Sequence, residues 1–271
     1  MLELLKKNTK SNFAKNLRLL TIRMVYLGKA SHIASVLSCV DIITALFFDH
    51  MNFSKINYKD INRDKFILSK GHAGAAVYAA LALKGIIPIN KLDSYYKNGS
   101  IFSGHVSHYK VPGVEFSTGS LGQGIGVACG IALASKIDKK TNKIYTLVGD
   151  GELNEGSCWE AFLFANHHNL ENLTIIIDKN NYQSILKTDK TLTLAPLKEK
   201  IKSFGLNVFE VDGNNLADLK KVLKKNTKST KVIIANTVKG KGVSFMENNI
   251  KWHYRNPNEN EYIKSIKEIL K

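Results

Sequence analysis

The run IYTLVGDGEL, residues 144–153, carries the strongest indication of the fold. It starts as a short apolar segment rich in β-branched and aromatic side chains, which is typical of a buried strand, and it turns at Gly149-Asp150-Gly151. A helix is expected next, followed by a second apolar run, LTIIIDKNN, at residues 173–181. A strand, a helix and a strand of this combined length predict a βαβ unit with two parallel strands.

Polar side chains follow both strands of this unit. Asp150 comes directly after the first strand, and Asn180 follows the second, about 30 residues later. Because the carboxyl ends of parallel strands meet at one edge of a sheet, we expect the two side chains to lie together. A carboxylate and an amide oxygen are hard ligands that suit Mg²⁺ or Ca²⁺. Gly149 and Gly151 would let an anion approach the backbone beside a helix N-terminus, so the segment predicts a metal–diphosphate site.

Other apolar runs extend the pattern along the chain. Strands are predicted at Phe66–Leu68, Val208–Val211 and Val232–Asn236. Helices are predicted at Asn12–Leu27, Cys39–Phe48 and Gly74–Lys84, and a last basic helix within residues 256–271. This alternation predicts an α/β fold with three layers, α/β/α, around a mostly parallel sheet. Without an internal repeat or a low-complexity linker, we expect one domain over residues 1–271.

The composition is that of an ordinary globular protein. Of 271 residues, 44% are hydrophobic and 23% charged, and no apolar run reaches the roughly 18 residues that a membrane helix needs. The polar, charged stretch Met1–Asn12 lacks the apolar segment of a signal peptide. The three cysteines form no CxxC pair, which argues against disulfides or a zinc site. We therefore expect a soluble cytoplasmic protein without a membrane partner.

The net charge of +16 raises the alternative of nucleic-acid binding. The lysines are spread along the chain, however, and aromatic side chains are not interleaved with a basic cluster. A solvated surface is the simpler interpretation, so no nucleic-acid partner is expected.

Several motifs together resemble one enzyme family. Gly149-Asp150-Gly151 followed by Asn180-Asn181 resembles the thiamine diphosphate motif, and GDGELNEGSCWEA, residues 149–161, resembles transketolases in particular. Matching stretches in the transketolase order are Ala30–His32, LSKGH at 68–72, Gly104-His105, STGSLGQG at 117–124, TVKGKG at 237–242 and Trp252-His253. The resemblance covers about residues 15–260 and implies the thiamine-diphosphate-binding fold, specifically the domain that holds the diphosphate.

The resemblance also implies a partner chain. Transketolases are usually more than twice this length, so the sequence resembles the N-terminal subunit of the split, two-chain form. The implied partner is the C-terminal transketolase subunit, which carries the pyrimidine-binding half, with two copies of each chain in a heterotetramer. The implied reaction is the transfer of a two-carbon ketol unit from a ketose, usually a phosphate, to an aldose, as in pentose phosphate metabolism.

Roles follow for individual residues from the same resemblance. The implied cofactors are thiamine diphosphate and Mg²⁺ (or Ca²⁺). The implied metal ligands are Asp150, Asn180 and the backbone carbonyl of Tyr182. The implied cofactor contacts are His72, Gly119, Leu121, Gly149, Gly151 and Asn180. The implied catalytic groups are His32, His105 and His253 around the sugar, with Glu155 and Glu160 between paired active sites.

The sequence departs from the family near the substrate. Val106 follows His105 where proline is usual, and Tyr254-Arg255 follow His253 where glycine and lysine are commoner. Tyr182 replaces a smaller aliphatic residue. These changes put the sugar in doubt rather than the cofactor. Two alternatives stay open: a subunit of another thiamine diphosphate enzyme, related to deoxyxylulose-phosphate synthase or 2-oxo acid dehydrogenase, and a catalytically idle interaction subunit.

Overall fold

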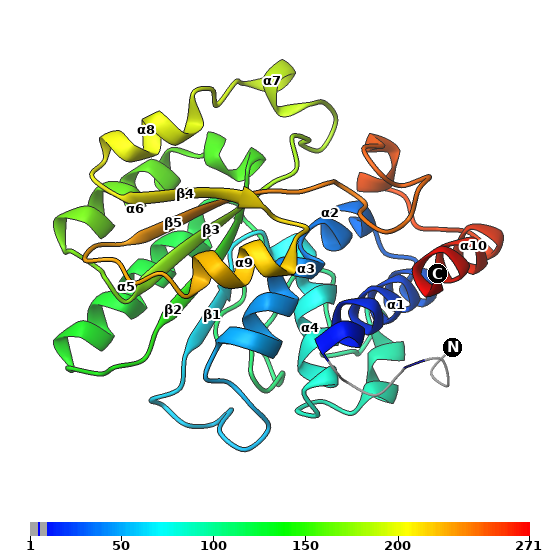
Figure 1. Cartoon of the computed structure of the whole chain (residues 1–271). Coiled ribbons are helices and arrows are strands. Elements are labelled where there is room, and N and C mark those ends of the chain that lie inside the picture. The colour runs from blue at the N-terminus through cyan, green and yellow to red at the C-terminus, as the bar shows by residue number, and fades with distance from the viewer. Residues whose placement is uncertain (1–4, 6–9) are drawn as a thin grey trace.

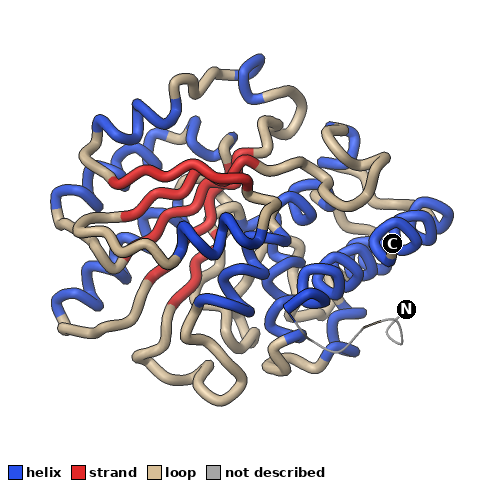
Figure 2. The backbone as a smooth tube through the Cα atoms, in the orientation of Figure 1, coloured by secondary structure: helices blue, strands red, loops and turns tan. Residues whose placement is uncertain are grey.

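A parallel sheet forms the centre of the molecule (Figures 1 and 2). The computed structural model describes Leu5 and residues 10–271, so most of the stretch Met1–Asn12 lies outside the described residues. Within them the sheet has five strands in the order β1-β2-β3-β5-β4, and every neighbouring pair is parallel. The strands are β1 (Lys65–Leu68), β2 (Ile144–Gly149), β3 (Leu173–Lys179), β4 (Asn207–Asp212) and β5 (Lys231–Asn236). All five predicted strands are confirmed.

Alternate side chains of each inner strand enter two separate cores. Ile175 and Ile177 of β3 join one apolar cluster, and Ile176 between them joins the other. The first cluster is covered by α5 (Gln123–Ile137), α6 (Gly156–His167) and α8 (Leu197–Ser203). The second is covered by α1 (Lys10–Gly28), α2 (Ile33–Ser38), α3 (Val40–Thr44), α4 (Gly74–Leu83) and α9 (Leu216–Leu223) (Figure 1). Burial on both faces explains the near-continuous apolar strands, and the three-layer prediction is confirmed.

The helix predicted at Cys39–Phe48 corresponds to α3 and the π-helical turn that follows it, but the short helix α2 before it was not predicted. The region begins earlier, with α2, and continues through α3 into a π-helical turn, η2 (Ala45–His50). The break falls at Cys39, where the Cys39 thiol donates to Val36 O and the Ser38 hydroxyl, shared with Asp178, lies 3.0 Å from Ser35 O. These side chains compete with the backbone for the carbonyls of the last turn of α2. Apolar periodicity does not reveal that competition.

The remaining elements complete the chain. The C-terminal helix α10 (Glu259–Leu270) begins with a capping box between Asn258 and Glu261 and packs on α1, where the rings of Tyr26 and Tyr262 stack at 4.2 Å. The short elements are η3 (Gly71–Ala73), η4 (Ile89–Ser94), η5 (Gly151–Asn154), α7 (Thr188–Thr191) and η6 (Ile250–His253). Cys39, Cys129 and Cys158 are buried and free. No helix in the described part is both long and apolar enough to cross a membrane.

Candidate functional site

A cavity of about 290 Å³ lies at the carboxyl ends of the central strands. It gathers residues from segments that are far apart in the sequence, because the loops after β1, β2 and β3 meet at this edge. All but two of the predicted site residues line it: His32, His72, His105, Gly119, Leu121, Gly149, Asp150, Gly151, Asn180, Tyr182 and His253. The exceptions are Glu155 and Glu160, which are exposed around the start of α6 and outside the lining.

Asp150 and Asn180 lie at the floor of the cavity, as the βαβ argument predicted. Asp150 is 2% exposed, and its Oδ1 accepts from the Gly151 amide at 2.9 Å while Oδ2 accepts from the Asn181 amide at 2.6 Å. Burial, with the nearby charge of Asp178, raises the pKa of Asp150 to about 6. The Asn180 side chain accepts at Oδ1 from the Tyr182 amide, at 3.1 Å.

This donor set fits a hard divalent cation. The raised pKa of Asp150 means that its hydrogen bonds do not fully offset the free-energy cost of burying the carboxylate charge. A bound cation would offset the rest of that cost. In the described residues no three His, Cys, Asp or Glu side chains group closely enough to hold a metal. The predicted set has one carboxylate, one amide and one backbone carbonyl, so it belongs to the Mg²⁺ type that takes its other ligands from phosphate and water.

Asp178 supports this floor from below, and the sequence motifs did not identify it. It is fully buried and accepts from Lys70, from the hydroxyls of Ser38 and Thr237, and from the Asn180 amide nitrogen at 3.4 Å. The last contact orients the Asn180 amide so that its oxygen is the atom left for a cation. Burial opposes ionisation of Asp178, but the charge of Lys70 outweighs it and lowers the pKa of the carboxyl.

Two buried lysines stand beside the cavity and were also missed. Lys70 lines it, and Lys239 lies behind it, 3.2 Å from His253 Nδ1 and 3.4 Å from Ser35 Oγ. Burial, and then the charge of Lys70, lowers the pKa of Lys239 to about 8. Both lysines lie within the quoted motifs, LSKGH and TVKGKG, and they make this end of the cavity a favourable place for an anion.

Four histidines cluster in the same cavity, and one of them, His253, contacts Lys239. The ring of His32 lies 5.2 Å from that of His72, 5.7 Å from that of His105 and 4.9 Å from that of His253. Burial followed by neighbouring positive charges lowers the pKa of His32 to about 4 and that of His253 to about 3. The rings are therefore neutral near pH 7, and a neutral imidazole can both donate and accept hydrogen bonds.

His32 adopts a strained backbone conformation to join this cluster. Its φ is 71°, in the left-handed region, and its amide donates to the His253 carbonyl at 2.7 Å. Such a conformation costs energy for a side chain with a Cβ and persists only where the surroundings enforce it. The backbone bond to His253 provides that restraint.

Glu152 ties together the loops that carry these groups. The side chain is 1% exposed, and it accepts from the Ser69 hydroxyl, the Gly122 amide at 2.9 Å and the Gly149 amide at 3.0 Å. One carboxylate thus joins the ends of β1 and β2 to the start of α5. In the sequence, only the position of Glu152 within the GDGEL turn indicates that it belongs to the site.

Three residues that depart from the family pattern, Val106, Tyr254 and Arg255, occupy different environments in the structure. Tyr254 lines the cavity, and its ring lies 4.8 Å from that of His253. Arg255 is bound to Glu261 by two contacts of 2.6 and 2.7 Å, and Val106 is 2% exposed and lies in the core. Of the three, only Tyr254 lines the cavity.

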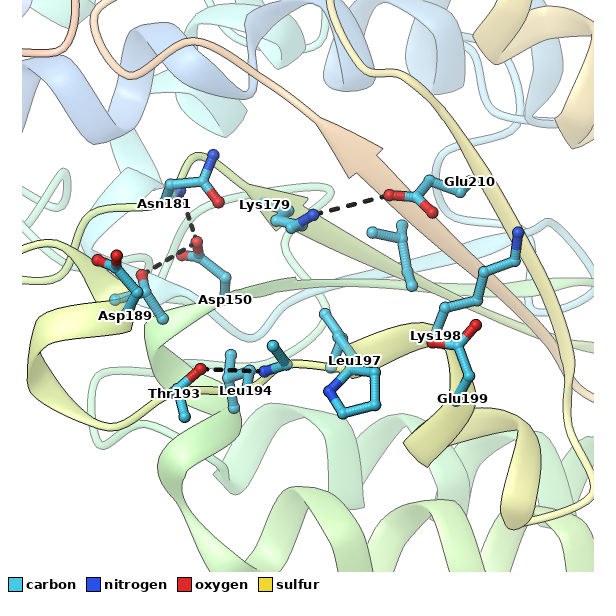
Figure 3. Close-up of a pocket in the computed structure, with 14 residues that line it drawn as sticks. Asp150, Lys179, Asn181, Asp189, Thr193, Leu194, Leu197, Lys198, Glu199 and Glu210 are labelled. Atoms are coloured by element: carbon cyan, nitrogen blue, oxygen red, sulfur yellow. Dashed lines mark hydrogen bonds and ion pairs between the residues drawn. The ribbon is translucent and has the colours of Figure 1, made fainter.

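A second cavity, of about 320 Å³, shares Asp150 with the first (Figure 3). Asp150 and Asn181 lie at one end of it, Lys179 and Glu210 form an ion pair at 3.6 Å beside it, and the segment 193–199 closes it. Asp150 therefore lines both cavities, although only 2% of the residue is exposed.

The comparisons with known proteins agree with this geometry. Residues 9–271 match the family described as "Transketolase, thiamine diphosphate binding domain". An apulose-4-phosphate transketolase subunit of Phocaeicola vulgatus is 39% identical over 251 residues, which make up 92% of this chain and 89% of that protein. A 6-deoxy-6-sulfo-D-fructose transketolase subunit of a Clostridium species is 36% identical over 261 residues, 95% of each chain.

Solved structures extend the likeness to longer proteins. The transketolase of Campylobacter jejuni superimposes with a TM-score of 0.90 at 30% identity and covers 96% of this chain. The match takes up 42% of that protein, so this chain spans about two fifths of the full-length enzyme. Sequence family, fold and length all lead to one conclusion. The chain belongs to the family of transketolase thiamine diphosphate binding domains.

Proposed function

We propose that this chain is the N-terminal, diphosphate-binding subunit of a two-chain transketolase, and that its described residues belong to one domain. The complete enzyme would transfer a two-carbon ketol unit from a ketose, usually a phosphate, to an aldose. One observation carries the proposal: a single cavity combines an oxygen-donor floor, buried lysines and a cluster of neutral histidines. These are the groups needed for a cation, a diphosphate and a sugar.

Each part of the cavity has a proposed ligand. Asp150, Asn180 and the Tyr182 carbonyl would hold Mg²⁺ or Ca²⁺, with Asp178 orienting the amide. His72, Lys70, Lys239 and the amides of Gly149 and Gly151 would surround the diphosphate, although in this structure the Gly149 amide donates to Glu152 and the Gly151 amide to Asp150. Gly119 and Leu121 would contact the aminopyrimidine. When bound, thiamine diphosphate supplies the carbon nucleophile for ketol transfer.

The histidines would handle the sugar. His32, His105 and His253 are neutral near pH 7, so each can donate a hydrogen bond to one hydroxyl or accept one from another. A neutral imidazole can also accept a proton from a hydroxyl as the bond between two carbons breaks. Positioning and proton transfer are therefore the roles that this chain would contribute.

A second chain is part of the proposal. Thiamine enzymes need a carboxylate at the aminopyrimidine. Glu155 and Glu160 lie outside the cavity lining, and Glu152, which lines it, is already bonded to Ser69, Gly122 and Gly149. The relatives of similar length are named as subunits, and the longer relatives are more than twice this length. We expect the C-terminal, pyrimidine-binding subunit as partner, two copies of each chain, and a cytoplasmic enzyme of carbohydrate metabolism.

The subunit proposal has a direct test. The chain is purified alone, supplied with Mg²⁺ and thiamine diphosphate, and assayed for ketol transfer before and after the second chain is added. We expect activity only in the reconstituted pair. Full activity from the lone chain would contradict the two-chain proposal.

Two variants separate the metal from the sugar end of the cavity. Asp150→Ala should abolish Mg²⁺-dependent cofactor binding in the reconstituted enzyme while the protein stays folded. His105→Ala should leave the cofactor Kd within about twofold and lower kcat by about 10²-fold or more, since acid–base and positioning groups contribute at that level. His108→Ala is the control, because His108 is exposed and outside the cavity. Loss of cofactor binding in His105→Ala would show that its role had been exchanged with that of His72.

The sugar itself stays open in this proposal. The two short relatives are named for different substrates, apulose 4-phosphate and 6-deoxy-6-sulfo-D-fructose, so the subunit type does not fix the donor. The alternatives, another thiamine diphosphate enzyme or an idle subunit, would be distinguished by offering the reconstituted pair ketose phosphates, pyruvate and 2-oxo acids in turn. Cofactor binding without turnover of any of them would favour the idle subunit.

A further inference from the structure

A short hairpin follows β3 and carries one of the proposed metal ligands. We call residues 181–188 the β3 hairpin. Tyr182 pairs with Lys187 in an isolated antiparallel bridge, the Gln183 amide donates to Leu186 O at 2.9 Å, and the Thr188 amide donates to Asn181 O at 3.0 Å. The backbone carbonyl of Tyr182 therefore moves with a closed unit rather than with a free loop.

Both ends of the β3 hairpin hold the same carboxylate oxygen. Asp150 Oδ2 accepts from the Asn181 amide at 2.6 Å and from the Thr188 hydroxyl at 3.3 Å (Figure 3 shows the Asn181 contact). The Thr188 residue is 7% exposed, whereas the other residues of the hairpin are half-buried or exposed. Its hydroxyl is thus directed inward, toward a site residue of a different strand.

These contacts leave one acceptor position on Asp150. An ionised carboxylate offers about four lone-pair positions, two on each oxygen. The Asn181 amide and the Thr188 hydroxyl use those of Oδ2, and the Gly151 amide uses one of Oδ1. The remaining lone-pair position is on Oδ1. This oxygen accepts a hydrogen bond from the Gly151 amide, and Gly151 also lines the first cavity.

A capping or packing role explains Thr188 less well. The hydroxyl does not cap α7, since Lys187 is the residue at the N-cap and no side chain caps that helix. Thr193 on the wall of the second cavity shows the local alternative, because its Oγ1 accepts from the Ala195 amide of its own loop at 3.3 Å. The Thr188 hydroxyl instead makes a long-range hydrogen bond, to Asp150, which is 38 residues earlier in the chain.

We propose that Thr188 is a positioning residue for the metal site: it clasps the β3 hairpin to Asp150, so that the carboxylate and the Tyr182 carbonyl are held as one preformed ligand pair. This inference rests on the proposed function of the cavity. The contact between Thr188 and Asp150 couples the hairpin to cation binding. Loss of the hydroxyl weakens cation binding, and cation binding tightens the hairpin, because the two events share the same carboxylate.

The first experiment measures Mg²⁺ affinity by calorimetry on the full chain with saturating thiamine diphosphate. Thr188→Val removes the hydroxyl and keeps the shape, and we expect Mg²⁺ affinity to fall about tenfold, as for other groups that orient a metal ligand. Thr188→Ser restores the hydroxyl and should return the affinity to within about twofold. Thr193→Val is the matched control in the neighbouring loop and should change nothing.

The second experiment needs no variant. Amide hydrogen exchange of the wild-type chain, with thiamine diphosphate present, is followed with and without Mg²⁺. We expect slower exchange at Asn181, Gln183 and Thr188 when Mg²⁺ is present, with little change in α9, which lies outside the site. This measurement decides the question even if Thr188→Val fails to fold.

The outcomes are distinguishable. Wild-type affinity in Thr188→Val, equal weakening in Thr188→Ser, or hairpin exchange that ignores Mg²⁺ would each overturn the clasp. If the wild-type chain itself shows no Mg²⁺-dependent cofactor binding, alone or with its second chain, the proposed function fails first. Weak Mg²⁺ binding in Thr188→Val alone, with hairpin exchange that responds to Mg²⁺ in the wild type, supports the clasp.

Discussion

Lys70 and Asp178 form a buried ion pair beneath the cavity, with 1% and 0% of their side chains exposed. The two residues lie 108 positions apart, on the loop after β1 and at the end of β3. Burial alone would lower the pKa of Lys70, but the charge of Asp178 raises it above its ordinary value. Each charge therefore depends on the other, and the pair fixes the loop that carries His72 to the strand that carries Asn180.

Removal of one partner should destabilise the chain strongly. Asp178→Asn leaves the ammonium group of Lys70 buried and uncompensated, so we expect the free energy of unfolding to fall by about 3–5 kcal/mol. Urea denaturation followed by circular dichroism measures it. Asp138→Asn is the control, since the Lys140–Asp138 pair is exposed and should contribute under about 1 kcal/mol. A similar small loss in both variants would show that the buried pair is not held as described.

The histidine cluster should make the fold sensitive to mild acid. The folded-state pKa values of His32 and His253 are about 4 and about 3, below the ordinary value of 6.5, chiefly through burial. Between pH 6.5 and about 4 the unfolded chain binds protons that the folded chain does not, so stability falls as pH decreases through that range. Urea midpoints at pH 7.5 and pH 5 measure the loss. His253→Gln should flatten the profile, and an unchanged slope would contradict the assignment.

Cofactor affinity should decline on the alkaline side because of Lys239. Its pKa is lowered to about 8, chiefly by burial, so the ammonium form that attracts a diphosphate is lost as pH rises through that value. We expect the Kd of thiamine diphosphate to increase between pH 7 and 9.5 at saturating Mg²⁺. Lys239→Met should bind weakly at every pH and show a flatter profile. Lys241→Met, at a half-exposed lysine paired with Glu247, should retain the wild-type profile, and a change there would implicate overall charge instead.

Tyr254 should influence which sugar is accepted. The side chain is 61% exposed and lies at the cavity beside His253, where the family commonly has glycine. Tyr254→Gly should change the KM for aldose acceptors by about 5- to 30-fold, which corresponds to about 1–2 kcal/mol of aromatic contact, without changing the Kd of thiamine diphosphate. A screen of phosphorylated, nucleotide-linked and free aldoses with the reconstituted pair measures it. Identical acceptor preference in Tyr254→Gly would dismiss the idea, as would wild-type turnover restricted to ribose 5-phosphate and erythrose 4-phosphate.

The exposed face of α5 and α6 should form the contact between two copies of this chain. Leu163 and Phe164 are 59% and 38% exposed there, and a Cβ added at Gly126 or Gly130 would meet nothing within 4 Å. Glycines without a neighbour permit close approach of another helix, and Glu155 and Glu160, around the start of α6, are also exposed. Leu163→Asp should halve the mass of the assembly in light scattering. Ile56→Asp, at a 98% exposed loop residue, should not; equal masses throughout would reject this interface.

Sequence patterns predicted the fold well because both faces of the sheet are buried. Strands such as Leu173–Lys179 are nearly continuous apolar runs with no competing helical periodicity. Helix α2, before the helix predicted at Cys39–Phe48, was not predicted because its end depends on side chains, Ser38 and Cys39, that contact backbone carbonyls. Periodicity records which face is apolar and carries no information on that competition.

The site was predicted less completely than the fold. The motif residues gathered as expected, because parallel topology brings strand ends together. Lys70, Lys239 and Glu152 were overlooked although they stand inside the motifs, since lysine and glutamate are usually solvated. Asp178 had a usable signal: a carboxylate at the end of an apolar strand run must find partners when buried. Most of its partners come from other segments of the chain, and no local pattern names them.

The bond from the His32 amide to the His253 carbonyl joins an early loop of the chain to one of its last. During synthesis, residue 253 leaves the ribosome only after nearly every strand and helix has been made. The histidine cluster of the pocket therefore cannot assemble on a partly made chain. Contacts of such long range also favour slow folding. A chain truncated before His253 would keep much of its apolar core and still lack part of the cavity lining.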